Sequence, residues 1–416
     1  MMSSQNKNIL IKNISQIVTF DEEEQFTVIE NGDILINKGK ISEVGKNIKS
    51  TDCETIDGSG KTALPGLIDC HTHFIFSGTR EDEFEMKIRG VPYLEIAKKG
   101  GGILNTVRKV RNASKEELVK EGCRRLDSFL QNGVTTVEVK SGYGLSTESE
   151  IKMLEAADEV NKLHSVDVVP TFLGAHVVPE EFKGKTDKYV DLVVKEMIPE
   201  VADKKLAEFC DVFLEEGAFN YGQTRLILET GKKYGLIPKL HSDQFSSIGG
   251  VKLAVELEAA SVDHLDAISE EDIKILAKSD VIGVFLPGAV FFLGQKKYVP
   301  ARKLIGNNVK YALSTDFNPG SCMTENLILI GSIACTQLKM LPSECIKAVT
   351  LNAAKAVNRF DIGNIKTGLK ADIVLFNCDN YRYPFYHFGI NHVDTVIKNG
   401  KILLADGELI KTDLPD

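Results

Sequence analysis

Two histidines separated by one residue close an apolar run in the sequence PGLIDCHTHF, at His71 and His73. Side chains two apart on a strand point to the same face, so both imidazoles can reach one point in space. Imidazole nitrogen is a good ligand for zinc and for iron. Two isolated histidines with this spacing can also lie at the edge of a core or face solvent, so the interpretation of the motif depends on the residues around it.

An alternation of apolar strands and amphipathic helices fills the middle of the chain. Strands are expected at 67–73, 135–144, 168–176, 211–219, 237–245, 261–265, 281–289 and 309–320. Stretches between them, such as Lys115–Asn132 and Glu148–His164, carry apolar residues at the three- and four-residue spacing of helices. Eight strand and helix units in roughly 290 residues match the length of a TIM barrel, so we predict an α/β chain with a (β/α)8 barrel.

The two ends of the chain read as short strands joined by turns. NILIKNISQIVTF and FTVIENGDILINKGKISEVG near the start, and VDTVIKNGKILLADGELI near the end, are rich in β-branched residues, and the last two contain NG or KG turn sequences. We therefore expect a small β-sandwich-like domain composed of residues 1–64 and 359–416. The barrel is expected over 65–358.

Side chains capable of chemistry gather where the expected strands end. The carboxyl ends of barrel strands form the face on which TIM-barrel active sites are built. The residues at these ends are His71, His73, Lys140, Tyr143, His176, Glu215, Glu216, His241, Gln244, His264, Asp316 and Asn318. Five of the eight histidines of the chain are among them, a concentration that favours a catalytic site over packing.

Four of these residues could surround one cation. In a closed barrel the first strand neighbours the eighth, and the fifth lies across the mouth, so the site could comprise His71, His73, His241 and Asp316. Three imidazoles and a carboxylate suit Zn²⁺ or iron, and water held there becomes a nucleophile near neutral pH. The expected fourth strand ends in FLEEGAF, without a lysine to bridge a second ion. We therefore predict one ion per chain and expect Lys140 to pair with a carboxylate such as Glu138.

Several stretches together resemble the amidohydrolase superfamily, namely LPGLIDCHTH, VDHL, STDFNPG and TLNAAKAVNRFDIGNIKTGLKADIVLFN. Within it the chain is similar to the imidazolonepropionase family of histidine degradation, through GTREDEFEMKIRG, KKGGGILNTV, VEVKSGYGL, TFLGAHVVP and HSDQFSSIGG. The resemblance spans nearly the whole chain. It implies a metal-dependent cyclic amide hydrolase that converts 4-imidazolone-5-propanoate to N-formimidoyl-L-glutamate.

The resemblance also implies roles for individual residues. The ligands of a single Zn²⁺ or Fe²⁺/Fe³⁺ would be His71, His73, His241 and Asp316. Substrate contacts would come from Arg80, Tyr143, His176, Gln244, Asn318, Gly320 and Ser321. A guanidinium fork at Arg80 suits the propanoate carboxylate, and the backbone N–H groups of Gly320 and Ser321 could bind an anion.

Two of these residues could instead have a purely structural role. Arg80 precedes an acidic run, Glu81 to Glu83, and could form a surface ion pair instead. Tyr143 lies in SGYG and could be a turn residue that packs on the rim.

The implied mechanism is attack of metal-bound hydroxide on the ring carbonyl. Asp316 would take the proton of the water and pass it towards the leaving nitrogen. His264 would stabilise the developing oxyanion or hold the water. Gln244 would orient water or a ring nitrogen, and cannot act as the proton-accepting base because an amide does not take up that proton.

The composition of the chain indicates which kinds of molecule it can bind. The net charge is −9 and no basic stripe is present, which argues against nucleic acid. No apolar run approaches the length of about 18 residues that spans a membrane, and the eight cysteines form no CxxC pair. We expect a cytoplasmic enzyme with a small-molecule substrate, and the resemblance implies a homodimer.

Two other functions remain open. An aminohydrolase acting on a purine- or pyrimidine-like ring would share the metal ligands, and only Arg80 with Tyr143 and His176 favours a small ring that carries a carboxylate. A non-enzymatic scaffold on the same barrel would be expected to have lost ligands, whereas all four are present here.

Overall fold

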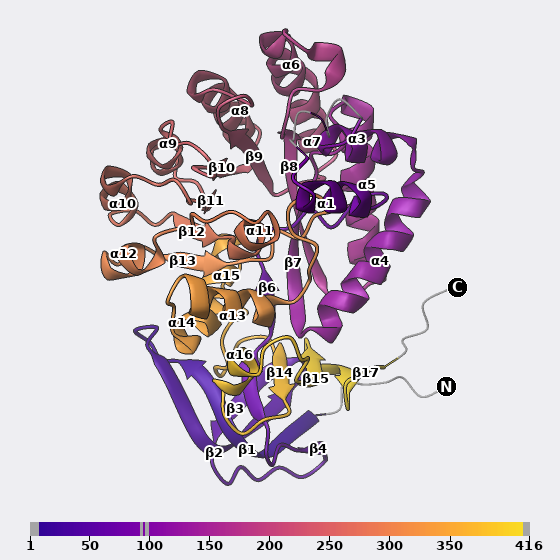
Figure 1. Cartoon of the computed structure of the whole chain (residues 1–416). Coiled ribbons are helices and arrows are strands. Elements are labelled where there is room, and N and C mark those ends of the chain that lie inside the picture. Colours follow the sequence, from indigo (N-terminus) through magenta and orange to yellow (C-terminus); the bar gives the residue numbers. More distant parts are fainter. Residues whose placement is uncertain (1–7, 92–94, 96–99, 411–416) are drawn as a thin grey trace.

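The computed structural model describes residues 8–91, 95 and 100–410. Its larger part is a barrel of eight parallel strands hydrogen-bonded in chain order (Figure 1). These strands are β6 (Leu67–Asp69), β7 (Val134–Lys140), β8 (Asp167–Ala175), β9 (Phe209–Leu214), β10 (Ile237–Ser242), β11 (Ser261–His264), β12 (Ile282–Phe285) and β13 (Tyr311–Leu313). Each falls within or overlaps one of the expected segments, so the predicted barrel is confirmed.

The barrel closes just beyond the ends of its first and last strands. Thr72 and Phe317 form a parallel bridge. The N–H of His73 donates to the carbonyl of Phe317 at 2.9 Å, and the N–H of Asp316 donates to the carbonyl of His71 at 3.1 Å. The seam of the barrel therefore runs through three of the predicted metal ligands.

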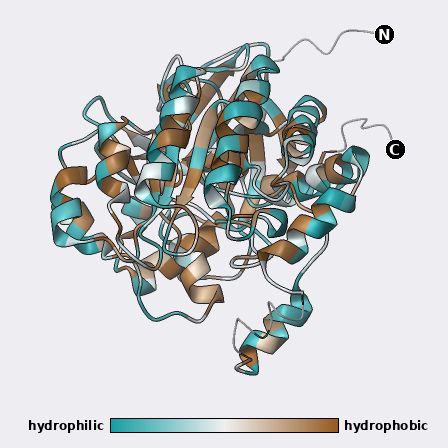
Figure 2. Cartoon of the chain, turned by 90° about the horizontal axis from the view of Figure 1, so that it is seen from above, coloured by the Kyte–Doolittle hydropathy of each residue, from teal (hydrophilic) through white to brown (hydrophobic). Residues whose placement is uncertain are grey.

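Helices surround the barrel, although α11 (Pro287–Phe292) is drawn near its centre in Figure 1 (Figures 1 and 2). They are α3 (Ile103–Asn112), α4 (Lys115–Gln131), α5 (Thr147–Leu163), α6 (Thr186–Leu192), α7 (Ile198–Asp203), α8 (Tyr221–Lys233), α9 (Gly250–Glu256), α10 (Glu270–Leu276), α11 (Pro287–Phe292), α12 (Ala301–Gly306), α13 (Leu327–Gln337), α14 (Pro342–Ala348) and α15 (Leu351–Ala356). A capping box fixes the start of α4, where Ser114 and Glu117 each accept the backbone N–H of the other. The expected helices of Lys115–Asn132 and Glu148–His164 are α4 and α5.

Short elements complete the barrel domain. α1 (Glu81–Ile88) follows the first strand, and a 3-10 turn η1 (Glu180–Phe182) and a π turn η2 (Val193–Met197) flank α6. Lys98 and Lys99, the first two residues of the KKGGGILNTV stretch, lie outside the described residues.

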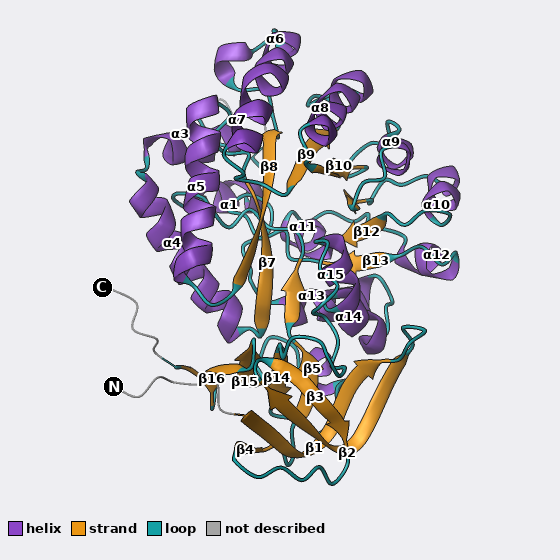
Figure 3. Cartoon of the chain, turned by 180° about the vertical axis from the view of Figure 1, so that it is seen from behind, coloured by secondary structure: helices purple, strands orange, loops and turns teal. Residues whose placement is uncertain are grey.

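Both ends of the chain build one further sheet, below the barrel in Figure 3. Its strands are β1 (Asn8–Phe20), β2 (Phe26–Asn37), β3 (Lys40–Gly45), β4 (Cys53–Asp57), β5 (Thr62–Pro65), β14 (Ile373–Phe376), β15 (Val393–Lys398), β16 (Lys401–Ala405) and β17 (Glu408–Leu409), with a short α16 (Tyr383–Tyr386) before β15. β14 pairs antiparallel with β5 and so joins the two ends, while β4 and β5 run parallel to β1. We call this the terminal sheet.

The terminal sheet has its own core. That core is aliphatic and draws on strands from both ends of the chain, including Ile14, Ile34 and Ile373. Lys398 links the sheet to the barrel, because its Nζ lies 2.7 Å from Oδ2 of Asp372 and 2.6 Å from Oδ2 of Asp167, the first residue of β8. The predicted limits of the domains, 1–64 with 359–416 and 65–358, stay a prediction, and residues 1–7 and 411–416 lie outside the described part.

Candidate active site

The strands β11 and β13 lead into unusual backbone at the mouth of the barrel. His264 has φ of 82° and Asp316 has φ of 55°, the left-handed region that residues other than glycine seldom adopt. Such backbone persists only where the surroundings hold it, and it clusters at functional sites.

The four predicted ligands converge. Nε2 of His71 and Nε2 of His73 each lie 3.6 Å from Oδ1 of Asp316. The ring centroids of His71 and His241 are 4.4 Å apart. Ligand atoms of His71, His73 and Asp316 lie within 4.8 Å of one another, and the same holds for His71, His241 and His264. The structure therefore brings the predicted ligand set together and places His264 beside it.

The donor atoms fit a bound cation. Nε2 of His71 and Nδ1 of His264 are buried and have no hydrogen-bond partner among the described residues. A buried polar atom left without a partner costs free energy, so such atoms call for an explanation. Neutral imidazoles and a carboxylate arranged around one point are the donor set that zinc and iron prefer, and a cation held by the predicted ligands would satisfy the free Nε2 of His71.

Two buried aspartates orient the imidazoles. Nδ1 of His71 lies 2.6 Å from Oδ2 of Asp263, and Nδ1 of His241 lies 2.9 Å from Oδ2 of Asp211. A carboxylate at Nδ1 fixes the proton there and leaves Nε2 for the cation. Sequence reasoning missed both aspartates. The signal was a carboxylate inside an apolar strand, in CDVFL and in SVDHL.

Burial sets the protonation of the site. It lowers the pKa of His71, His73 and His264 well below the usual range of histidine, so these imidazoles are neutral at neutral pH, as metal ligands must be. Burial also raises the pKa of Asp316 to about 7, against the opposing effect of His241. A carboxyl group with that pKa can both take up and release a proton near neutral pH.

A cavity of about 460 Å³ opens above the donor atoms. It is lined by most of the predicted site residues, namely His73, Arg80, Tyr143, His176, His241, Gln244, His264, Asp316, Asn318, Gly320 and Ser321. His71 does not line it because its side chain is fully buried beneath. Glu216 is exposed and Lys140 is buried below the site, so neither strand-end residue joins the cavity.

Arg80 forms an ion pair, but not the surface pair considered above. Its Nε and Nη2 lie 2.9 and 2.8 Å from Oε2 of Glu83, and its side chain is only 9% exposed. Glu83 also accepts the N–H of Gly102 and the side-chain amide of Asn105, which ties the loop to α3. The remaining Nη1 lies against Gly320, where any Cβ would collide with it. Glycine at 320 therefore lets the guanidinium enter the cavity.

The loop after β13 is held by one amide. Oδ1 of Asn318 accepts the N–H groups of Gly320 and Ser321 at 2.8 and 2.9 Å. The two N–H groups that the sequence offered to an anion are thus already bonded, and an anion could reach them only if Asn318 moved. Nδ2 of Asn318 donates to Oγ of Ser321 at 2.7 Å, which completes the loop.

Tyr143 and His176 form one wall of the cavity. Tyr143 is 3% exposed and its ring lies 5.7 Å from that of His73, so it faces the site rather than a surface turn. His176 stacks on His73 at 5.1 Å, and its Nδ1 lies 3.1 Å from the carbonyl of Gly142. Burial lowers the pKa of His176 to about 3, so its ring is neutral.

The loop that carries Gln244 is anchored from β9. Glu215 accepts the N–H of Phe245 at 2.9 Å and that of Ser246 at 3.3 Å, and it also bonds the Ser246 hydroxyl. The strand-end carboxylate therefore holds a loop and does not face the substrate cavity.

Lys87 lines the cavity and was missed from the sequence. Its Nζ donates to the carbonyl of Gly320 at 3.0 Å, on the same side as Arg80. Burial and the nearby charge of Arg80 lower the pKa of Lys87. The available signal was a second cation seven residues after Arg80 in GTREDEFEMKIRG.

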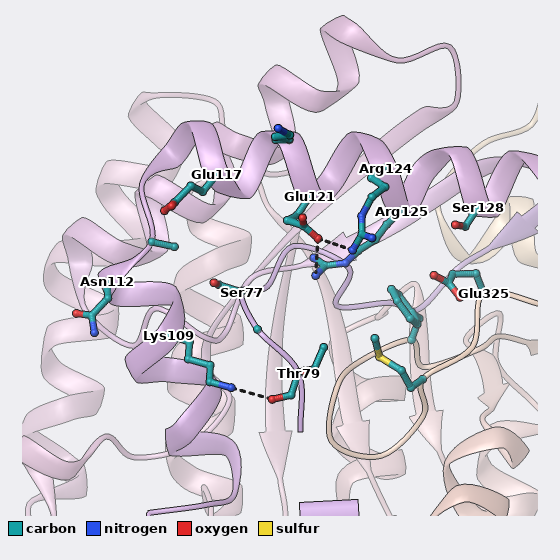
Figure 4. Close-up of a pocket in the computed structure, with 15 residues that line it drawn as sticks. Ser77, Thr79, Lys109, Asn112, Glu117, Glu121, Arg124, Arg125, Ser128 and Glu325 are labelled. Atoms are coloured by element: carbon teal, nitrogen blue, oxygen red, sulfur yellow. Dashed lines mark hydrogen bonds and ion pairs between the residues drawn. The ribbon is translucent and has the colours of Figure 1, made fainter. Parts of the chain in front are cut away.

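A larger cavity, about 730 Å³, lies between the loop after β6 and helix α4 (Figure 4). No histidine is among its lining residues. Two of its cations have partners of their own, since Arg124 pairs with Glu121 at 2.7 Å and Lys109 donates to the carbonyl of Thr79 at 2.8 Å. Size alone therefore does not identify the active site, and the smaller cavity carries the chemistry.

Comparison with known proteins defines the class. The sequence model of the amidohydrolase family matches residues 62–403, and the chain belongs to that family. The barrel fold recurs in a triazine hydrolase variant, with TM-score 0.76, 19% identity and coverage of 98% of this chain and 97% of that one. It also recurs in an adenosine deaminase of Xanthomonas campestris, with TM-score 0.72, 18% identity and coverage of 97% and 94%.

Curated relatives narrow the class to the imidazolonepropionases, as the sequence motifs predicted. The imidazolonepropionase of Alkaliphilus metalliredigens is 48% identical over 97% of this chain and 99% of its own length. That of Geobacillus kaustophilus is 49% identical over 92% of each chain. Among the described residues, no helix has both the length and the apolar character needed to cross a membrane.

Proposed function

We propose that this enzyme hydrolyses the ring amide of 4-imidazolone-5-propanoate to N-formimidoyl-L-glutamate in histidine degradation. The observation that carries this proposal is the pairing of two features in one cavity. Donor atoms for a cation lie on its floor, and the guanidinium of Arg80 enters it from the rim. A small substrate with a reactive ring amide at one end and a carboxylate at the other matches this arrangement.

The residues that would hold the cation are His71, His73, His241 and Asp316. We propose one Zn²⁺ or Fe²⁺/Fe³⁺ per chain, because these ligand types accept both metals. A bound cation lowers the pKa of water and polarises a carbonyl oxygen.

Protons in the reaction are handled by side chains of this chain. The carboxylate of Asp316, whose pKa is raised to about 7 by burial, takes a proton from the attacking water and returns it to the ring nitrogen as the C–N bond breaks. The neutral imidazole of His264 donates a hydrogen bond to the oxygen that becomes negative. The amide of Gln244, which cannot accept the proton, orients the water or a ring nitrogen.

Substrate is oriented by the rim of the cavity. Arg80 binds the propanoate carboxylate, and the ammonium of Lys87 on the same side adds a second positive charge. Tyr143, His176 and Asn318 hydrogen-bond the polar edges of the ring. Buried neutral donors hold a neutral ring without a charge penalty.

An aminohydrolase acting on a nucleobase-like ring remains the second candidate function, because the metal ligands would serve both reactions. The two half-buried cations of the rim, Arg80 and Lys87, disfavour it. A neutral base would leave the guanidinium and the ammonium without a partner for their charge beyond Glu83.

The test of the proposed substrate is Arg80→Ala. The variant should lose about 2–5 kcal/mol in kcat/KM for 4-imidazolone-5-propanoate, the range for truncating one partner of a buried charge pair. Arg80→Lys should recover only part, since an ammonium cannot make the two-pronged contact. The measurement is kcat/KM for this substrate and for its neutral methyl amide analogue, in wild type and both variants.

The neutral analogue is the control for this experiment. It has no carboxylate to lose, so Arg80→Ala should barely change its kcat/KM, and metal content should stay near that of wild type. An equal decrease in kcat/KM for the charged and the neutral compound would show that Arg80 holds the loop through Glu83 and does not bind the substrate carboxylate.

We also propose that the enzyme is a cytoplasmic homodimer. All eight cysteines are free thiols, as in proteins of reducing compartments. Exposed aromatic side chains at Phe291, Tyr386 and Phe388 provide apolar surface that a second copy could cover. Sedimentation velocity at micromolar concentration should give a dimer, and a monomer there would reject this assembly.

A further inference from the structure

A layer of fully buried charges lies directly beneath the candidate metal site. It consists of Glu138, Lys140, Asp211, Lys239 and Asp263, whose side chains are all 0% exposed. We call these five residues the ion cluster. Three carboxylates and two ammonium groups are seldom buried together, because each charge must find partners to offset its loss of hydration.

Lys140 is the centre of the ion cluster. Its Nζ lies 2.7 Å from Oε1 of Glu138, 2.8 Å from Oδ2 of Asp211 and 3.7 Å from Oδ2 of Asp263. The expectation that Lys140 pairs with a carboxylate is confirmed. An ammonium held by carboxylates is also the wrong species for a metal-bridging carbamate, which would itself be an anion among anions.

Lys140 connects two of the predicted ligands. The Oδ2 atom of Asp211 that it contacts is the same atom that faces Nδ1 of His241. The Oδ2 atom of Asp263 that lies near it is the same atom that faces Nδ1 of His71. One ammonium therefore sits behind both carboxylates that set the direction of the imidazoles.

The position of this ammonium is one that a cation could take. Ligand atoms of Asp211, His241 and Asp263 lie within 4.8 Å of one another, a spacing that could hold a metal ion. Lys140 Nζ already lies against both aspartates of that group. Glu138, the third carboxylate, is shared with Lys239, whose Nζ lies 3.3 Å away.

We propose that Lys140 is a positioning residue whose ammonium takes the place of a second metal ion. In doing so it fixes Asp211 and Asp263, so that His71 and His241 present Nε2 to a single cation above them. A covalently attached charge cannot dissociate, so the lower position stays filled whatever the metal supply. The inference rests on the proposed metal site, but not on which ring the enzyme opens.

The proposal predicts two changes in Lys140→Ala. The upper site should bind zinc about 10–100-fold more weakly, the range for loss of a partner behind a metal ligand. The emptied position, lined by two aspartates, should take up a second zinc. Titration of the metal-free protein with zinc against a chromophoric chelator measures both the affinity and the number of sites, without any substrate.

Lys239→Ala is the matched control. It removes a fully buried ammonium of the same cluster that contacts Glu138 and the carbonyl of Cys70, and forms no ion pair with Asp211 or Asp263 among the described residues. It should keep one zinc per chain with an affinity within about threefold of wild type. If Lys140→Ala does not fold, Lys140→Met replaces it, and this variant should show the weakened upper site without the second zinc because its side chain fills the position.

Activity supplies a further readout. When saturated with zinc at the upper site, Lys140→Met should lose kcat with KM within about twofold of wild type, since Lys140 does not line the substrate cavity. One zinc bound at wild-type affinity in the Lys140 variants, or equal loss of affinity in the Lys140 and Lys239 variants, would overturn the proposal. A failure of the substrate assignment would leave the zinc titrations unchanged, so the two can be told apart.

Discussion

The core of the terminal sheet is aliphatic, whereas the mouth of the barrel buries imidazoles, carboxylates and ammonium groups. Burial of an aliphatic side chain stabilises a fold by about 25 cal/mol for each Å² removed from water, while burial of a charge is unfavourable unless partners offset it. Aliphatic burial that stabilises the fold and buried polar groups that can do chemistry are therefore found in two different regions of the molecule. Substitutions in one should leave the property of the other largely intact.

The largest effect is expected at the proposed metal ligands at the mouth of the barrel. His241→Ala should lose its metal and its turnover, because one of the four proposed ligands is removed. His264→Ala should retain metal and lose about 10²–10³-fold in kcat, the range for one donor to a developing oxyanion. Elemental analysis and steady-state kinetics of both variants measure this, with thermal unfolding as a check that the fold remains.

The variants of His241 and His264 also test which histidines bind the metal. His264 lies close enough to His71 and His241 to share a metal ion with them. Its position therefore allows it to be a ligand, and we predict that it is not one because of its proposed role in catalysis. Equal metal loss in the two variants would make His264 a ligand. More than one tightly bound ion per wild-type chain would contradict the mononuclear site.

An intermediate effect is expected in the terminal sheet. Ile373→Ala removes a fully buried side chain from the aliphatic core and should lower the free energy of unfolding by about 2–5 kcal/mol. Below the melting transition, kcat/KM should stay near wild type, since no residue of this core lines the cavity. Chemical denaturation and activity at 25 °C measure the two properties side by side.

Ile390→Ala is the control for this region. Ile390 is 52% exposed, so its truncation should change stability by no more than about 0.5 kcal/mol. A large loss of kcat/KM in the folded Ile373→Ala protein would show that the terminal sheet and the mouth of the barrel are coupled.

The smallest effect is expected at His164, the residue that follows helix α5. The Nδ1 atom of His164 accepts the N–H of Val166 at 3.1 Å, and burial lowers the pKa of His164 although Asp127 opposes this. The folded protein therefore binds fewer protons than the unfolded chain, and the contribution of His164 to stability is lost as the pH falls through the ordinary range of histidine. His164→Gln should show a shallower decline of stability between pH 7 and pH 5, measured by denaturation across that range. A slope equal to that of wild type would refute the assignment.

Much of this structure could be predicted from local sequence pattern. The eight barrel strands and the two long helices follow from short runs of apolar residues, and the histidine pair at 71 and 73 follows from strand periodicity. The hydrogen bonds of Asn318 to Gly320 and Ser321 could not be predicted from local sequence pattern, because they depend on the path of one loop. The partnership of Lys140 with Asp211 and Asp263 joins three separate strands, and a sequence carries no local sign of which strands its buried charges will meet.

The closure of the barrel at Thr72 and Phe317 has a consequence for the order of folding. A growing chain that has been synthesised only through β12 already carries His71, His73 and His241, but it has neither Asp316 nor the strand that completes the seam. Contacts between such distant segments form late, because the long loop between them must first be ordered. The full set of proposed ligands therefore exists only in a finished barrel, and a metal ion bound there would connect the last strand to the first once both have been synthesised.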